Sequence, residues 1–127
     1  NDLDILANLP NLEAAEVCQL ANVSKLPDLC KSKLQHLCFE NMKNLLDFKQ
    51  LQFAPALKTA AETVCPAAIT ADTILPVMLN LKTKQCAFFT SSSKKNKEFE
   101  KLASKYDKKY EANTHIVRQI IFPDGRM

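Results

Sequence analysis

The chain has 127 residues, of which 46% are hydrophobic and 24% are charged, and this balance is that of one folded domain. Its net charge of +3 is too small to indicate a nucleic-acid partner by itself, and no apolar run reaches the roughly 18 residues of a membrane span. The single glycine, Gly125, disfavours sandwiches and barrels, whose tight turns need residues that tolerate positive φ. The composition therefore favours helices joined by short connections.

The first half of the chain predicts a series of short helices. Apolar residues recur there at intervals of three and four, as in Ala14, Val17, Cys18 and Ala21. Prolines and asparagines stand where such helices would begin or end. The expected helices cover residues 2–9, 12–23, 27–38, 42–49 and 55–65.

The second half is more varied. Thr70 or Thr73 can cap a helix that reaches residue 82, with Pro76 delaying its start or kinking it. Residues 84–90 are ambiguous and could be extended, and residues 90–96 predict an exposed loop. A charged helix is expected over residues 97–111. The β-branched run at residues 115–122 favours a strand, closed by the turn signal Pro123-Asp124-Gly125.

An internal repeat is predicted within residues 17–65, at an offset of 28 residues. Placing Pro27 over Pro55 puts Leu29 on Leu57. Each unit would be a helix, a short link and a second helix that begins at proline. Because one such hairpin cannot bury its apolar face alone, the two units would share a core.

This unit resembles the helical 3-box and BACK region that follows BTB domains. The residues that carry the resemblance are Val17-Cys18-Gln19-Leu20-Ala21, Leu26-Pro27-Asp28-Leu29-Cys30, Glu40-Asn41-Met42-Lys43-Asn44-Leu45-Leu46 and Ala56-Leu57-Lys58. They cover roughly half of the chain, although no BTB fold precedes residue 17 and the link from Cys38 to Asn41 is short. The resemblance implies a helical fold and a ubiquitin-ligase role.

Five cysteines leave two interpretations open. Most of them fall where the expected helices would bury them, which favours reduced core thiols in a cytosolic or nuclear protein. The alternative is a secreted domain with two disulfides, in which Asn22-Val23-Ser24 would be a glycosylation site. The cysteines are Cys18, Cys30, Cys38, Cys65 and Cys86.

The sequence offers little for catalysis or metal binding. Its two histidines are His36, expected on a helix surface, and His115, which has no obvious partner in the sequence. Cys30, His36 and Cys38 lack a clear fourth ligand for zinc. We therefore expect no enzyme activity, no metal and no cofactor.

Two neighbouring segments are candidates for partner binding. Phe88 and Phe89 stand beside the serine-rich loop, where they could anchor a partner, although such residues are more often core. Lys94, Lys95 and Lys97 open the most basic stretch, which interleaved acids dilute. A solvated helix face is the expectation for these lysines, with phosphate-backbone contact as the alternative.

Together these observations predict a mainly α fold of helical hairpin repeats in a small orthogonal bundle, with one short C-terminal strand possible. Residues 1–90 would form the hairpin repeats, and residues 91–127 a basic loop, a charged helix and an extended segment packed on the same domain. The start at Asn1 without Met suggests an excised domain or a processed chain.

The predicted function is a non-catalytic protein–protein interaction module, an adaptor or scaffold region of a larger intracellular protein. The alternatives are a secreted disulfide-bonded protein and a nucleic-acid-associated domain. The expected partner is another protein, and a second copy of the chain could also be one. Binding to nucleic acid would be weak, and no contact with a membrane is expected.

Overall fold

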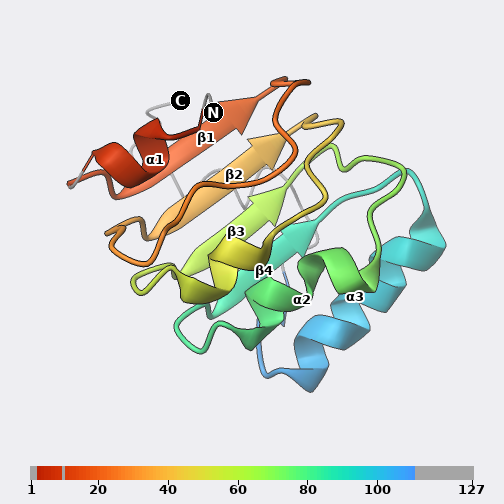
Figure 1. Ribbon diagram of the computed structural model, residues 1–127. Coiled ribbons are helices and arrows are strands. Elements are labelled where there is room, and N and C mark those ends of the chain that lie inside the picture. Colours follow the sequence, from red (N-terminus) through yellow and green to blue (C-terminus); the bar gives the residue numbers. More distant parts are fainter. Residues whose placement is uncertain (1–2, 10, 111–127) are drawn as a thin grey trace, which may run out of the picture.

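A computed structural model describes residues 3–9 and 11–110 and shows an α/β fold built on one parallel sheet (Figure 1). Five strands lie in the order in which they occur along the chain. The expectation of a mainly α bundle of hairpins is therefore wrong. The elements are α1 (Ile5–Asn8), β1 (Ala14–Cys18), β2 (His36–Glu40), the 3-10 helix η1 (Lys49–Phe53), β3 (Thr59–Glu62), α2 (Ala71–Leu79), β4 (Gln85–Phe88), α3 (Ser93–Lys105) and β5 (Lys109–Tyr110).

Each strand begins one turn of a solenoid. Ala14 pairs with His36, His36 with Thr59, Thr59 with Gln85 and Gln85 with Lys109, so successive turns are 22 to 26 residues long. The predicted repeat offset of 28 residues is wrong, although a repeat exists. Each turn lies against its sequence neighbours, which is the arrangement of a one-dimensional stack.

The same backbone hydrogen bonds recur from turn to turn. The carbonyl of Glu13 accepts from the N–H groups that open β2, and the carbonyls of Gln35 and Lys58 do the same for β3 and β4. At the other end of the strands, Gln19 and Asn41 occupy equivalent positions with φ of 59° and 53°. Both of their N–H groups donate to a carbonyl of the following turn. The chain thus leaves β1 and β2 through the same left-handed step.

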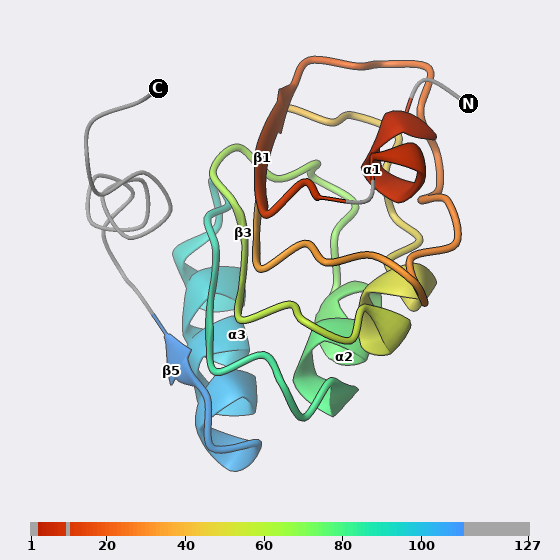
Figure 2. The same ribbon diagram turned by 90° about the vertical axis from the view of Figure 1, so that its left-hand side faces the viewer.

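The helices cover one face of the sheet. Figure 2 shows α1 and α2 on the same side of the strands, and α3 adds the buried Phe99 and Ala103 to the same core cluster. From the sheet, this core receives the alternate residues Ala15, Val17, Leu37, Phe39, Ala60, Cys86 and Phe88. Most of the buried apolar residues therefore lie between the sheet and this outer layer.

The expected helices at 12–23, 27–38, 42–49 and 55–65 are absent from those described residues, and the reason is visible in the second turn. Leu34, Leu37, Phe39, Met42 and Leu45 are all buried there. Leu37 and Phe39 alternate on strand β2. Leu34, three positions before Leu37, and Met42, three positions after Phe39, turn inward from the loops on either side of the strand. Intervals of three on either side of a strand imitate the spacing of a helix.

The helices expected elsewhere are confirmed with shifted ends. α2 lies within the range predicted to end at residue 82, and Thr70 caps it by accepting from the N–H of Thr73. α3 begins at Ser93 instead of residue 97, because the Ser92 side chain caps it. The ambiguous segment 84–90 contains strand β4. The strand predicted at residues 115–122 lies outside the described residues.

Buried polar side chains tie consecutive turns together where the strands begin. The Asn80 amide donates to the carbonyls of Leu51 and Ala54 at 2.7 and 2.9 Å. The Thr83 hydroxyl donates to the carbonyl of Leu57 at 2.8 Å. Asn80 and Thr83 are 4% and 0% exposed, so these bonds satisfy carbonyls that lie out of reach of water.

Lys108 repeats this arrangement one turn later. Its ammonium donates to the carbonyls of Asn80 and Thr83 at 2.9 and 2.6 Å, and its side chain is buried. Burial lowers the pKa of Lys108 from its ordinary value. A lysine from the sequence-predicted basic stretch therefore serves to attach the last turn to the turn before it.

Replacement of Asn80 tests this attachment. We expect Asn80→Ala to lower the free energy of unfolding by about 2–4 kcal/mol, because two buried carbonyls lose their donor. Asn44→Ala is the matched control: the Asn44 amide also donates to a carbonyl of the preceding turn, that of Ala21, but its side chain is exposed. The control should lose less than about 1 kcal/mol in denaturant unfolding. Equal losses would contradict the proposed role of burial.

Two leucines test the packing of the core. Leu29 and Leu57 are both 0% exposed. Replacing either with Ala should cost about 2–5 kcal/mol of unfolding free energy, the usual range for a buried leucine. Exposed Lys43→Ala should change stability little, as surface substitutions do. A loss below about 1 kcal/mol at either leucine in denaturant unfolding would mean that its side chain is not packed in the core.

Candidate functional site

The five residues predicted to bind a partner divide into core and surface residues. Phe88 lies in the core, with ring centroids 6.2 Å from Phe48 and 6.4 Å from Phe99. The Lys95 ammonium donates to the carbonyl of Ala67 at 2.6 Å, so it holds the start of α3 against the loop after β3. Phe89, Lys94 and Lys97 remain accessible: Phe89 is half-buried and both lysines are exposed.

Phe89 and Lys97 meet in a small pocket where β4, α3 and β5 adjoin. The pocket has a volume of about 160 Å³ and is open to solvent. Asn96, Lys97 and Glu100 come from the first two turns of α3. The residues that line it are Phe89, Asn96, Lys97, Glu100 and Tyr110.

Two of the lining residues are fixed by hydrogen bonds. The Asn96 side chain accepts from the N–H and the hydroxyl of Thr90 and donates to the Thr90 carbonyl, at 2.8, 3.0 and 3.1 Å. The Tyr110 hydroxyl accepts from the N–H of Phe88 and donates to the Phe88 carbonyl. Burial raises the pKa of Tyr110 to about 12, so the hydroxyl stays protonated. These residues form rigid walls.

The pocket therefore combines aromatic walls with a cation and an anion at its rim. Lys97 and Glu100 lie three positions apart on α3 and are exposed. The volume suits one side chain of a partner, held by contact with Phe89 and by polar contacts at the rim. Of the residues that line the pocket, the sequence analysis did not identify Asn96, Glu100 and Tyr110. Glu100 could have been found from its spacing of three residues from Lys97 on a helix. Tyr110 could not, because only the pairing of β5 with β4 brings it to the pocket.

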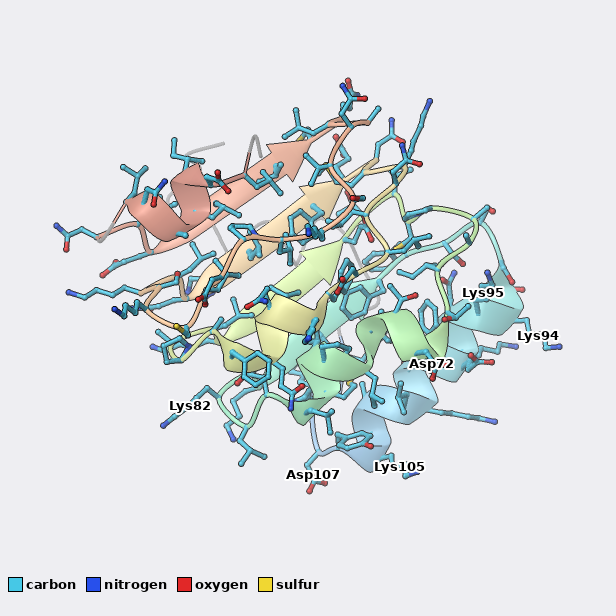
Figure 3. All side chains as sticks on the ribbon, in the orientation of Figure 1. Asp72, Lys82, Lys94, Lys95, Lys105 and Asp107 are labelled. Atoms are coloured by element: carbon cyan, nitrogen blue, oxygen red, sulfur yellow. The ribbon has the colours of Figure 1, made fainter. Side chains whose placement is uncertain are left out.

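The lysines of α3 form a stripe on the solvent side of the helix. Lys94, Lys97, Lys101 and Lys105 are exposed and follow one face. Figure 3 shows Lys94 and Lys105 at opposite ends of this helix. Glu98 and Glu100 are exposed among them. The ammonium groups of Lys95 and Lys108 donate to carbonyls of the fold itself, so fewer lysines of this region are available to contact a partner than the sequence suggested.

The other face of the sheet is the one away from α1 and α2, which both lie on the opposite side of the strands (Figure 2). At its centre Cys38, Ala61 and Ala87 are buried, and Ala14 and Phe89 pack against them. His36 lies on this face of β2, not on a helix surface as predicted, and burial followed by the charge of Lys58 lowers its pKa. Phe89 thus belongs both to this face and to the pocket.

The cysteines are less uniformly buried than predicted. Cys38 and Cys86 are buried, Cys65 is half-buried, and Cys18 and Cys30 are exposed. Burial raises the pKa of Cys86 to about 12, which keeps this thiol protonated. Among the described residues, no group of three or more His, Cys, Asp or Glu side chains could hold a metal ion.

Glu62 is a carboxyl group in the core. Its register partners on β2 and β4 are Phe39 and Phe88, so it interrupts an apolar row. The side chain is 0% exposed, and neither carboxyl oxygen has a hydrogen-bond partner among the described residues. Burial raises the pKa of Glu62 to about 8, against an opposing contribution from Cys65.

Comparison with known proteins gives no relative: no family model, no curated protein and no solved structure matches the chain. The resemblance to the 3-box and BACK region therefore stays a prediction. None of the helices in residues 3–9 and 11–110 has the length and apolar character to cross a bilayer.

The titration of Glu62 gives a pH-dependent stability. Below about pH 4.5 the carboxyl is protonated in both states; between about pH 4.5 and 8 the unfolded chain loses this proton while the folded chain keeps it. The free energy of unfolding should therefore fall over that window, by roughly 4–5 kcal/mol at most. Glu62→Gln should remove this contribution, so its stability relative to the parent should rise with pH.

Urea unfolding at several pH values between 4.5 and 8.5 measures this difference. Exposed Glu98→Gln is the control and should follow the parent across the range. A constant difference between Glu62→Gln and the parent would mean that the carboxyl ionises in the folded protein as readily as in the unfolded chain.

Proposed function

We propose that this chain is a non-catalytic protein-binding module, an adaptor or scaffold region of a larger intracellular protein. The architecture supports this: a solenoid with one strand per turn presents a continuous surface to which each turn contributes residues. The turn length and the spacing of Leu34, Leu37, Phe39 and Met42 are similar to those of leucine-rich repeats, whose turns have about 20–29 residues.

The observation that carries the proposal is the pocket beside Phe89. Rigid aromatic residues with a charged rim are typical of the sites where one partner side chain is anchored. The pocket opens beside the face of the sheet that carries Cys38, Ala61 and Ala87, to which Phe89 also belongs. A partner would cross the end of this face and place one side chain between Phe89, Lys97 and Glu100.

Nucleic-acid binding has less support. The exposed stripe of α3 alternates lysines with Glu98 and Glu100, and Lys95 and Lys108 are committed to carbonyls of the fold. Phosphate contact depends on accumulated positive charge, which this surface provides only in part.

Site-specific photo-crosslinking in the cells that express the protein tests the proposal. A photoreactive residue at Lys97 should yield a defined adduct with another protein, whereas the same residue at exposed Lys43, outside the pocket, should not. Phe89→Ala in the same chain should reduce the adduct about tenfold, the loss expected for an anchoring aromatic residue.

Three results would overturn the proposal. An adduct with nucleic acid only would favour the basic stripe, and an adduct with a second copy of the chain would make the pocket a site of self-association. Adducts of equal yield at Lys97 and Lys43 would show that the pocket selects no partner.

A further inference from the structure

Three large apolar side chains are exposed on neighbouring segments of two turns, where the strands begin. Phe53 is 49% exposed, Leu79 is 41% exposed and Leu81 is 83% exposed. They belong to two consecutive turns: Phe53 ends η1, and Leu79 ends α2. Large apolar residues gathered at such exposure are typical of interaction sites.

The hydrogen bonds of Asn80 bring together the backbone segments that carry these residues. Asn80 stands between Leu79 and Leu81 in sequence, and its amide binds the carbonyls of Leu51 and Ala54, which flank Phe53. Its own side-chain oxygen accepts from the N–H of Lys82 at 2.9 Å. The backbone that carries the three apolar residues is therefore held in one conformation, and the patch is a fixed shape.

The surroundings of this patch are basic. Residues 48–58 and 79–85 contain four lysines. Two exposed acids adjoin these segments: Asp47 accepts from the N–H of Lys49, and Asp107 precedes Lys108, which binds the carbonyls of Asn80 and Thr83. The lysines outnumber these acids. These lysines are all exposed, and Lys58 and Lys84 lie on adjacent turns, where the N–H of Lys84 donates to the carbonyl of Lys58 at 2.9 Å. The four are Lys49, Lys58, Lys82 and Lys84.

We propose that Phe53, Leu79 and Leu81 dock an acidic amphipathic helix of a partner protein. Leucines along one side of such a helix would cover the three side chains, and acidic residues beside them would meet Lys58, Lys82 or Lys84. An anionic lipid surface has the same chemistry but needs no fixed arrangement of side chains. The rigid hold of Asn80 on both turns favours a partner of defined shape.

This surface is separate from the pocket at Phe89. Figure 3 shows Lys82 at the end of the strands opposite to Lys94 and Lys95. A partner on one surface would therefore leave the other accessible, and failure of either proposal leaves the other standing.

The test uses the full chain and a labelled synthetic peptide that forms a helix with leucines on one side and glutamates on both flanks. In fluorescence anisotropy we expect this peptide to bind, and the same peptide with lysines in place of the glutamates to bind at least about tenfold more weakly. Leu81→Asp and Lys82→Glu should each weaken binding of the glutamate peptide about tenfold. Leu81→Met, which keeps a large apolar side chain at this position, should bind the peptide about as the parent does.

Val64→Asp is the matched control, because Val64 is 50% exposed but follows β3 at the opposite end of the strands. It should bind the peptide as the parent does. Equal binding by Leu81→Asp and the parent, or no binding by either, would overturn the proposal. So would Leu81-dependent binding to phosphatidylserine vesicles without binding to the peptide, or a self-association of the parent that Leu81→Asp abolishes.

Discussion

Hydrogen bonds from buried side chains of one turn to carbonyls of the turn before it join the later turns of this solenoid. Apolar burial alone is non-directional and would tolerate turns displaced along the stack. The Asn80 amide, the Thr83 hydroxyl and the Lys108 ammonium each bind a carbonyl one turn back, within a low-dielectric interior where an unpaired carbonyl is costly. The same contacts fix the loop around Asn80 and thereby the side chains on either side of it.

The sequence predicts the helices of this fold better than its strands. Thr70 and the run after it identify α2, because a cap and a helical face are local signals. The strands are short, and β2 places only Leu37 and Phe39 on the core face of the sheet. Leu34 and Met42 turn inward from the loops three positions before Leu37 and three positions after Phe39, so the spacing imitates a helix. The chain has one glycine, and Gln19 and Asn41 adopt the left-handed conformation that glycine usually provides at such turns. The sequence therefore lacked the glycines that would have indicated a turn after β1 and β2.

The candidate site was predictable in part. Phe89 and Lys97 were identified because an aromatic residue beside a basic stretch is a local pattern. Whether Phe88 or Phe89 faced the core depended on the alternation of β4, which required that segment to be assigned as a strand. The buried Lys108 and Glu62 were beyond reach, because charge in a sequence predicts exposure and only the stacking of turns places these two inside.

The layer opposite the sheet thickens along the chain. The connection from β1 to β2 contains no helix, the next contains the short η1, and the last two contain α2 and α3. An α-helix is about 10 Å across, whereas neighbouring strands lie about 4.8 Å apart, so helical turns spread farther on their outer side than extended ones. The connections that follow β1 are therefore of unequal width on this side of the sheet. We expect the sheet to curve more from β3 to β5 than from β1 to β3, so that a ligand lying along the strands would meet a different curvature at each end of the stack.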